Sequence, residues 1–513
     1  MRARAGAISA RGSLTLVLAV QAVVSVGTLR NTAFQDEALY LYAGRQIVRH
    51  LLGGPAPLDH YAFYFSGYPF VYPLIGGYLD RIGGLELARA FSLVCMLGVT
   101  ALVSAITARL FDRRAAVFAS ACYAVTGVVL FVGRLATFDA LCLFLIALAA
   151  GIGVYAGTAR RPWSAVAIGP VLVLAILAKY AALLFVPPVF AILVCLSVTS
   201  AGWRAAIGRT CLASFALALS LWVADRSIDH AAFHALAGST TDRSTTFVQS
   251  RISLFLHVLQ MGGILLAIGL VGLLLLMRGK RMRMFAVITF GTAWLAPAYH
   301  MYKHEPISLD KHIAYGLFFV APLAGYALAW LAGLERPDIA NAQRGYWLAA
   351  VAVVLAMFTL GLHQSQTLYS NWANTSKLSY ALHTQLRDGT GRIFAEDIEV
   401  ARFDARDVSE EWQWSSFYYP TYVTASRETL TGTPALIQAV TNRYYDLVEL
   451  SFNYFPDDAY TLANQMIRTR NYDLIAVLPL VNSYGRSHYY VWRSALAPGR
   501  GTFTSLTQLK LTA

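Results

Sequence analysis

Two adjacent acidic residues, Asp36 and Glu37, follow the first long apolar stretch of the chain, in the run FQDEALYLYAGRQ. The apolar residues 13–29 are long enough for a membrane span, so we expect the pair at a bilayer surface. Acidic side chains beside a membrane are costly and usually functional. Asp36 can take a proton from an incoming hydroxyl group, and Glu37 can orient Asp36 or the acceptor. The alternative is that both residues only favour a helix start.

Basic and polar side chains recur where later spans end on the same side. The segments that carry them are GRLATFD, LAKYAALLF and YHMYKHEPISLDKHIAYG. Cationic side chains bind phosphate and apolar spans can hold a lipid tail, so the pattern predicts a lipid-phosphate site. The alternative for the basic residues is that they snorkel to lipid headgroups, and for Asp139 that it caps a span. The candidate phosphate ligands are Arg134, Lys179, Lys303, Lys311 and His312, with Asp139 as a further catalytic candidate.

Composition places these residues in a polytopic membrane protein. The 513 residues are 57% hydrophobic and only 13% charged, and the mean hydropathy is +0.52. Soluble domains carry about 25% charged residues. The net charge of +13 comes from basic residues in short loops between spans, and no nucleic-acid-binding motif is present. The five cysteines lie in apolar runs, which argues against a disulfide framework or a cysteine zinc site.

Apolar runs of about 20 residues predict roughly 11 membrane spans. They are 13–29, 87–109, 115–133, 138–157, 163–178, 180–199, 206–224, 252–276, 284–299, 312–333 and 345–362. Arginine and lysine are concentrated at the N-terminus and in every second connection, which places those segments in the cytoplasm. The loop that contains Asp36, the turns at Arg134 and Lys179, and the loop 300–311 then face outward.

The polar tail differs from the rest of the chain. We expect a transmembrane domain over 1–362 and an exoplasmic α/β domain over 363–513. The segments YDLVEL and YDLIAVL are typical of buried strands, and residues 460–470 are typical of a helix before the second one. The first outer loop contains an amphipathic segment, ALYLYAGRQIVRHLL, which predicts a helix in the membrane interface.

The first outer loop also carries an aromatic run, YAFYFSGYPFVYPL. Tyrosine is common both at the membrane interface and in contact with ligands, so two interpretations stay open. The run is an interfacial belt or a platform for a sugar. The candidate substrate or interface residues are Tyr64, Tyr68, Tyr72 and His304.

The loop segments, in this order, resemble the C-type glycosyltransferase superfamily, in the branch of protein O-mannosyltransferases and bacterial aminoarabinose transferases. The resemblance covers residues 1–362. It rests on QDEALYLYAG, YFSGYPFVYPLIGGYLDRIGGLELARAFSLV, RLATFDALCLF, LAKYAALLFVPP and SLDKHIAYGLFFVAPLAG. The order of the motifs and the topology together are more specific than any one motif.

The resemblance implies a multi-pass enzyme of a bacterial inner or plasma membrane, with its site facing the periplasm or exterior. The donor would be a polyprenyl-phosphate sugar, and the acceptor a lipid, a glycan or a protein. Asp36 as the only base would give a single displacement that inverts the sugar carbon. Two other functions remain open, a lipid-linked sugar transporter or flippase, and a surface-glycan polymerase or ligase.

One departure from the family pattern concerns metal binding. The aminoarabinose transferases have a Glu-Lys pair before the prolines of the first loop, and the Glu is part of a metal site there. Here Ser66, Gly67 and Tyr68 precede Pro69. We therefore predict no metal as the main interpretation. The alternative is a divalent ion such as zinc on the loop histidines His300, His304 and His312.

Overall fold

The computed structural model describes residues 2–495 except 60, 62–64, 160–161, 229–247, 280, 334–339, 387–390, 419 and 484. By its contacts the chain divides into two compact units. Unit 1 comprises Met1–Leu29 and His60–Leu368, and unit 2 comprises Arg30–Asp59 and Tyr369–Ala513. The segment that contains Asp36 is thus part of the same unit as the polar tail, whereas we expected a division after residue 362. The division into two domains at residue 362 stays a prediction.

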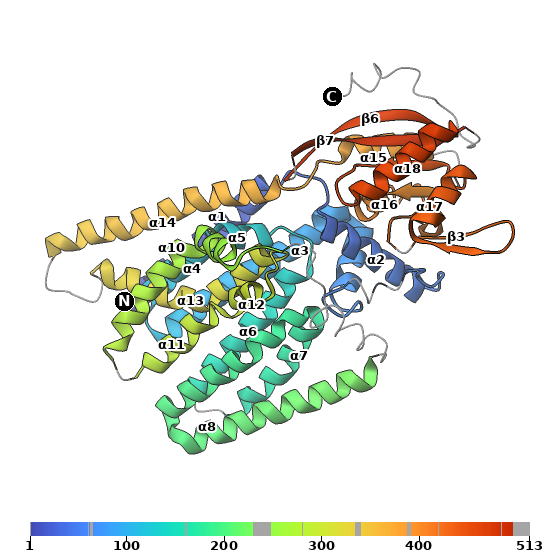
Figure 1. Cartoon of the computed structure of the whole chain (residues 1–513). Helices are drawn as coiled ribbons and strands as arrows, with labels where there is room; N and C mark the ends of the chain where they lie inside the picture. Colours follow the sequence, from blue (N-terminus) through green and yellow to red (C-terminus); the bar gives the residue numbers. More distant parts are fainter. Residues whose placement is uncertain are drawn as a thin grey trace. The chain divides into compact units, whose positions relative to one another are not determined.

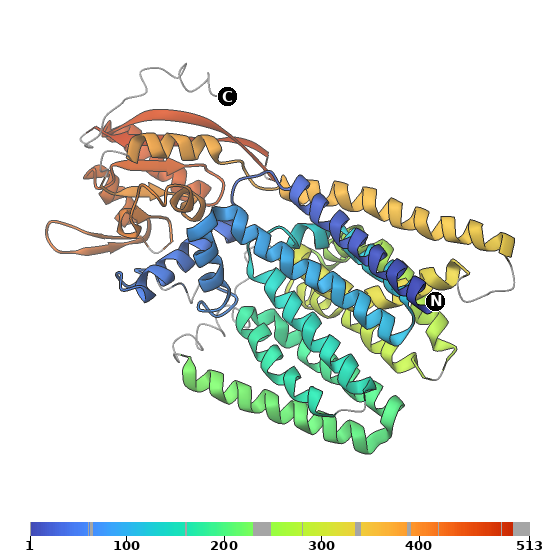
Figure 2. The same cartoon turned by 180° about the vertical axis from the view of Figure 1, so that it is seen from behind.

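Unit 1 is a bundle of helices, which Figures 1 and 2 show from opposite sides. Its described helices are α1 (Arg2–Thr28), α3 (Tyr72–Leu110), α4 (Arg113–Ala124), α5 (Gly127–Val132), α6 (Phe138–Thr158), η2 (Pro162–Ala167), α7 (Ile168–Ala178), η3 (Tyr180–Phe185), α8 (Val186–Ser227), α10 (Arg251–Met277), α11 (Arg283–Thr292), α12 (Leu295–Lys303), α13 (Leu309–Leu331) and α14 (Ala340–Tyr369). They are apolar on most faces, as expected for helices that are surrounded by lipid or by one another.

Within the described residues, six helices are long and apolar enough to cross a membrane. The chain is therefore an integral membrane protein of mainly helical structure. The predicted number of 11 spans is not confirmed. Two long helices, α3 and α8, are each interrupted by a kink at a glycine with positive φ. These glycines are Gly84 in α3 and Gly202 in α8. Such breaks are tolerated because glycine has no Cβ to clash in that conformation.

Helix α13 lies at the centre of unit 1. Of an apolar stretch of 18 residues in this helix, 89% is buried inside the protein. Neighbouring helices approach it closely where glycines replace side chains. A Cβ on Gly272 of α10 would lie 2.1 Å from the carbonyl oxygen of Leu323, so α10 and α13 are in backbone contact there. Small residues at such crossings are typical of membrane helix packing. The first turns of α13 carry the polar residues described below.

Unit 2 contains a five-stranded mixed sheet with the strand order β2-β1-β5-β7-β6. Strands β1 (Ile393–Ala395), β2 (Trp414–Ser415) and β5 (Leu447–Leu450) are parallel, whereas β6 (Tyr472–Asn482) and β7 (Gly485–Ser494) form an antiparallel hairpin beside β5. A separate hairpin pairs β3 (Thr421–Val423) with β4 (Thr429–Thr431). The strands expected in YDLVEL and YDLIAVL are confirmed as β5 and β6.

Two apolar clusters cover the two faces of this sheet, because successive strand residues point to opposite sides. Ile393 and Ala395 belong to one cluster and Phe394 to the other. Helices α15 (Ser376–Leu386) and α16 (Ile398–Asp404) contribute to the first cluster. Helices α17 (Gly432–Thr441) and α18 (Pro456–Thr469) contribute to the second. The helix expected over 460–470 is confirmed as α18.

Helix α2 (Gln35–Leu51) completes unit 2 and packs on α16. Its amphipathic sequence is confirmed as helical. Its apolar side is buried, with Leu41 fully so. Polar contacts anchor the segment that follows it, since Arg402 binds Asp59 at 2.7 Å and Arg49 binds Glu410 at 2.7 Å. The segment Arg30–Asp59 is therefore an integral part of the unit that contains the sheet.

Candidate functional site

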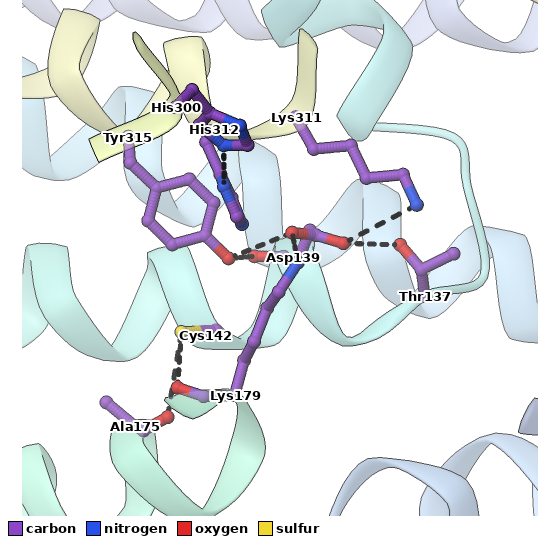
Figure 3. A network of polar contacts seen from close by, with 9 residues as sticks. All are labelled: Thr137, Asp139, Cys142, Ala175, Lys179, His300, Lys311, His312 and Tyr315. Atoms are coloured by element: carbon purple, nitrogen blue, oxygen red, sulfur yellow. Dashed lines mark hydrogen bonds and ion pairs between the residues drawn. The ribbon is translucent and has the colours of Figure 1, made fainter. Parts of the chain in front are cut away.

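A buried polar network lies in unit 1, where α6, the α7–η3 break and α13 meet (Figure 3). Asp139 is in the first turn of α6, and Lys179 occupies the single residue between α7 and η3. Lys311, His312 and Tyr315 come from the first turns of α13. Four sequence-predicted residues, Asp139, Lys179, Lys311 and His312, are thus brought together.

The carboxylate of Asp139 is the hub of this network. Its Oδ1 atom lies 2.6 Å from Nζ of Lys179, and its Oδ2 atom lies 4.0 Å from Nζ of Lys311. The hydroxyl groups of Thr137 and Tyr315 each donate to the carboxylate at 3.2 Å. Asp139 is 1% exposed, Lys179 5% and Lys311 4%. A buried ion requires partners of this kind, because its desolvation otherwise costs several kcal/mol.

The network brings cationic groups together at one place. Two ammonium groups, Lys179 and Lys311, face the single carboxylate of Asp139. His312 adds a ring whose Nδ1 atom is 2.8 Å from Nε2 of His300, while its own Nε2 atom is buried without a hydrogen-bond partner in the described part of the chain. Ammonium groups clustered among apolar helices attract an anion more strongly than they would in water. The arrangement is therefore suited to a phosphate group.

Backbone pairing fixes the position of Lys179. The N–H of Tyr68 donates to the carbonyl of Leu177 at 2.7 Å, and the N–H of Tyr180 donates to the carbonyl of Ser66 at 2.8 Å. The two chains run so close at Gly67 that a Cβ there would lie 2.1 Å from the carbonyl oxygen of Ala178. The segment Ser66-Gly67-Tyr68, which departs from the family pattern, thus clamps the break that carries Lys179.

A cysteine lies beneath this break. Sγ of Cys142 is 3.6 Å from the carbonyl oxygen of Ala175 and 3.7 Å from that of Lys179 (Figure 3). A thiol is a weak donor, so the contact orients these end-of-helix carbonyls without adding charge. Cys142 comes from the turn of α6 after Asp139, and this one turn therefore touches both the side chain and the backbone of Lys179.

Arg134 takes part in a different set of contacts. Its guanidinium binds the carboxylate of Glu86, which also accepts a hydrogen bond from Arg89 at 3.2 Å. Arg134 and Arg89 are buried, whereas Glu86 is 64% exposed on its side chain. Two guanidinium groups therefore converge on one exposed carboxylate. A role for Arg134 in phosphate binding stays a prediction.

The end of α12 and the start of α13 contribute histidines in two different ways. His300 and His312 contact each other, and Nδ1 of His300 is 2.6 Å from the carbonyl oxygen of Glu305. His304 has a left-handed backbone at the end of α12, and its Nδ1 atom is 3.0 Å from the carbonyl oxygen of Gln249. Lys303 is the last residue of α12 and is partly exposed. The described residues hold no group of three or more metal-ligating side chains.

The tyrosines of the first loop differ in how deeply they are buried. Tyr72 is fully buried, with its ring 5.4 Å from that of Phe138, so it packs in the core beside the start of α6. Tyr68 is half-buried, and its ring lies 5.5 Å from that of Phe70. Tyr64 lies outside the described residues.

The acidic pair is in unit 2, in the first turn of α2. Glu37 is completely buried, and its Oε2 atom accepts a hydrogen bond from the N–H of Phe34 at 2.9 Å. This contact holds the start of the helix, as a carboxylate three residues into a helix commonly does. Asp36 is the second residue of the helix and is partly exposed, so it is not the N-cap, which is Phe34.

Sequence reasoning missed two members of the network, Thr137 and Tyr315. Thr137 lies two residues before Asp139, and Tyr315 lies one helical turn after Lys311 on the same helix. Helical spacing was the signal available for Tyr315, since residues four apart share a face. The sequence places His300 in the same loop as His312 as a possible metal, phosphate or hydrogen-bond ligand, and in the structure its ring contacts that of His312.

Comparisons with known proteins agree with this architecture. Residues 75–224 match the family model described as dolichyl-phosphate-mannose-protein mannosyltransferase. The matched segment includes Asp139 and Lys179. A search of curated protein sequences finds no match.

Solved structures match over nearly the whole chain. ArnT from Cupriavidus metallidurans in the apo state has a TM-score of 0.60 at 16% identity, and the match covers 94% of this chain and 98% of ArnT. The same protein bound to undecaprenyl phosphate gives 0.59 at 17% identity, with 96% and 99% covered. The archaeal oligosaccharyltransferase AglB from Archaeoglobus fulgidus, in complex with an inhibitory peptide and a dolichol-phosphate, gives 0.56 at 13% identity, with 93% and 74% covered.

Identities this low establish the fold alone. The matches nevertheless cover 93–96% of the chain, and all three structures are of membrane glycosyltransferases. The resemblance predicted from the loop motifs is thereby confirmed, and the chain has the fold of the C-type membrane glycosyltransferases.

Proposed function

We propose that this protein is an inverting glycosyltransferase that uses a polyprenyl-phosphate sugar as donor. The observation that carries the proposal is the buried network in which the ammonium groups of Lys179 and Lys311 lie beside Asp139 inside an apolar bundle. Such a site can bind the lipid phosphate and stabilise the negative charge that develops as the phosphate leaves. The fold match to ArnT bound to undecaprenyl phosphate supports the same donor class.

In this mechanism the ammonium groups of Lys179 and Lys311 bind the donor phosphate, and His312 lies at the same site. Asp139 orients Lys179, and Tyr315 and Thr137 hold Asp139 in place by donating hydrogen bonds. Asp36 removes the proton of the acceptor hydroxyl as the sugar carbon is attacked, and Glu37 positions Asp36 by holding the start of α2. One displacement inverts the anomeric carbon, because no second carboxylate acts as nucleophile.

The proposed location is a bacterial inner or plasma membrane, with transfer at the outer face to a lipid, glycan or protein acceptor. The positive-inside distribution of basic loops supports that orientation. No metal enters the mechanism, since the lysines supply the positive charge that the leaving phosphate requires.

The test is a transfer assay in membranes with a labelled polyprenyl-phosphate sugar. The variant Asp36→Asn should lower the transfer rate by about 10²–10⁴, the usual contribution of a general base, and should leave donor binding unchanged. Asp457→Asn is the matched control, because Asp457 is also the second residue of its helix, α18, and is exposed.

A rate in Asp36→Asn equal to that of Asp457→Asn would contradict the role of Asp36. Movement of labelled lipid across proteoliposomes without any acceptor-linked product would instead favour a transporter.

A further inference from the structure

Unit 2 contains a cavity of about 190 Å³ that the proposed mechanism does not use. Its lining comes from the start of α2, the connection between α14 and α15, the start of α16 and the end of the β6–β7 hairpin. All of these residues belong to unit 2. Gln35, which immediately precedes Asp36, is one of them.

Part of the cavity lining is aromatic. The rings of Phe34 and Trp372 lie 5.1 Å apart at an angle of 55°, and Tyr454 and Tyr489 also line the cavity. The indole of Trp372 is held in place, because its Nε1–H donates to the carbonyl of Thr32 at 3.0 Å. The same ring is half-buried, so one part of it is accessible. A fixed, partly exposed aromatic ring offers a flat apolar surface to a ligand.

Another part of the cavity lining is polar. Asn371 and Asn482 line it, and their amide groups can both donate and accept hydrogen bonds. Ser483 belongs to this polar part, and its N–H donates a hydrogen bond to the carbonyl of Asn371 at 3.0 Å. Asn371 and Ser483 are exposed, so the cavity has a polar entrance at the surface of unit 2.

A buried carboxyl group, that of Asp397, also lines the cavity. Asp397 is 5% exposed, and its Oδ1 atom has no hydrogen-bond partner among the residues that the structure describes. A buried polar atom without a partner costs about 1–3 kcal/mol, so a ligand that supplies the missing hydrogen bond gains affinity. Burial, together with the nearby carboxyls of Glu399, Asp404 and Glu396, raises the pKa of Asp397 well above its usual value.

These features together define the class of ligand. An anion is disfavoured, because several carboxyl groups surround Asp397. A purely apolar ligand would leave Oδ1 of Asp397 without a partner among the described residues. A sugar ring meets all the requirements, because its C–H face packs on an aromatic ring while its hydroxyl groups donate to carboxyl and amide oxygens.

We infer that this cavity binds one uncharged sugar ring of a glycan-bearing acceptor. The assignment to the acceptor rests on the proposed transferase function, whereas binding of the sugar does not. Gln35 lines the cavity and precedes Asp36 in the same helical turn, so a bound ring lies at the turn that carries the proposed base. The cavity would thereby select acceptors that carry a sugar next to the hydroxyl to be modified.

The first experiment measures binding to the full chain in lipid nanodiscs by saturation-transfer NMR. The probes are methyl glycosides of neutral hexoses, methyl glucuronide and tetramethylammonium. We expect at least one neutral glycoside to bind and the glucuronide not to bind. Binding of tetramethylammonium in its place would overturn the inference, because an aromatic cavity beside a carboxyl group can also hold a cation.

Variants of Asp397 separate a binding role from a structural one. Asp397→Leu should weaken glycoside binding about tenfold while the apparent Tm stays the same or rises, because it removes a buried polar atom that lacks a partner. Asp397→Asn keeps a polar group there and should restore most of the affinity. Loss of Tm without loss of binding would contradict the inference.

A second variant fills the cavity from its exposed entrance. Ser483→Phe should abolish glycoside binding, and Ser426→Phe, on the exposed β3–β4 turn, is its matched control. In the transfer assay, Ser483→Phe should raise KM for the acceptor about tenfold, with kcat nearly unchanged.

The outcomes distinguish the two proposals. If Ser483→Phe abolishes glycoside binding but the wild-type protein shows no transfer activity, the cavity assignment stands and the proposed transferase function is contradicted. Transfer with an unchanged acceptor KM in Ser483→Phe would remove the cavity assignment alone.

Discussion

At the scale of single residues, the ion pair between Asp139 and Lys179 has two separable consequences, for stability and for donor binding. Both groups are buried and lie 2.6 Å apart. Removing one partner leaves the other charge uncompensated, whereas removing both leaves an apolar contact that is often as stable as the pair.

We therefore predict that Asp139→Asn lowers the stability of the protein by about 3–5 kcal/mol. The double variant Asp139→Leu/Lys179→Met should recover part of that loss, since Lys311 still lies at the site, and should not bind the donor phosphate. Apparent Tm in nanodiscs and binding of a labelled polyprenyl phosphate are the two measurements. Lys377→Met, in unit 2, is the control. Normal phosphate binding by the double variant would contradict the proposed role of Lys179.

Asp404 in unit 2 gives a prediction on pH. Burial raises the pKa of its carboxyl group from 3.8 to about 6, although Thr375, which donates to it at 2.6 Å, opposes the shift. The folded state therefore holds the proton more tightly than the unfolded state. This contribution to stability is fully present below about pH 4 and is lost as the pH rises through 6.

The variant Asp404→Asn should accordingly raise the stability of unit 2 at pH 7.5 by about 2 kcal/mol and have little effect near pH 4. Thermal unfolding of the full chain across this pH range is the measurement. Asp473→Asn, on the exposed face of β6, should follow the wild-type profile. Parallel profiles for Asp404→Asn and the wild type would show that Asp404 does not cause the dependence.

At the scale of elements, the contact between Ser66-Gly67-Tyr68 and the α7–η3 break determines where Lys179 lies. A Cβ on Gly67 would lie 2.1 Å from the carbonyl oxygen of Ala178, and this atom belongs to the backbone. The two chains must separate to admit a larger residue, and the hydrogen bonds on either side of Gly67 then lengthen.

Gly67→Ala should therefore lower affinity for the donor phosphate by about tenfold or more. The reason is that a small displacement of the Lys179 ammonium group away from the phosphate is costly. Gly208→Ala, on α8, is the matched control, since a Cβ there meets nothing within 4 Å. That substitution should be neutral or slightly stabilising. Equal donor affinity in the two variants would show that the close approach does not position Lys179.

The elements also show what sequence patterns can and cannot predict. Membrane helices, the strands β5 and β6 and helix α18 follow from apolar periodicity, which is a local signal. The grouping of Asp139, Lys179, Lys311 and His312 also follows, because the predicted topology places these helix ends on the same side of the bundle. The burial of Tyr72 against Phe138 and the pairing of Arg134 with Glu86 depend on side-chain packing, which periodicity does not encode.

At the scale of the whole molecule, unit 2 is assembled from two distant parts of the chain. Hydropathy alone assigned α2 to the membrane domain, because α2 lies between spans. Its buried Leu41 and Glu37 in fact pack within unit 2, where α16 contacts the same helix. A local pattern identifies such a helix but not its partner, since the partner lies hundreds of residues away.

This arrangement predicts the effect of a truncation. A chain that ends at Leu368 should leave the segment Arg30–Asp59 without the residues that cover it, including Arg402 and Glu410. Limited proteolysis should cut this segment much faster than in the full chain. Cleavage near Asp112, between α3 and α4 of unit 1, should be equal in both and serves as the control. Equal protection of Arg30–Asp59 would contradict the division into units.

The discontinuity of unit 2 also has a consequence for biosynthesis. Roughly 310 residues separate Asp59 from Tyr369. At about 5–20 residues per second, the ribosome needs roughly 15–60 seconds to add them. Throughout that time α2 has been synthesised but α16 has not. The apolar side of this amphipathic helix is therefore not yet covered by its partner. Lipid headgroups and acyl chains are the nearest surface that can shelter it, which makes the bilayer a temporary folding partner for α2.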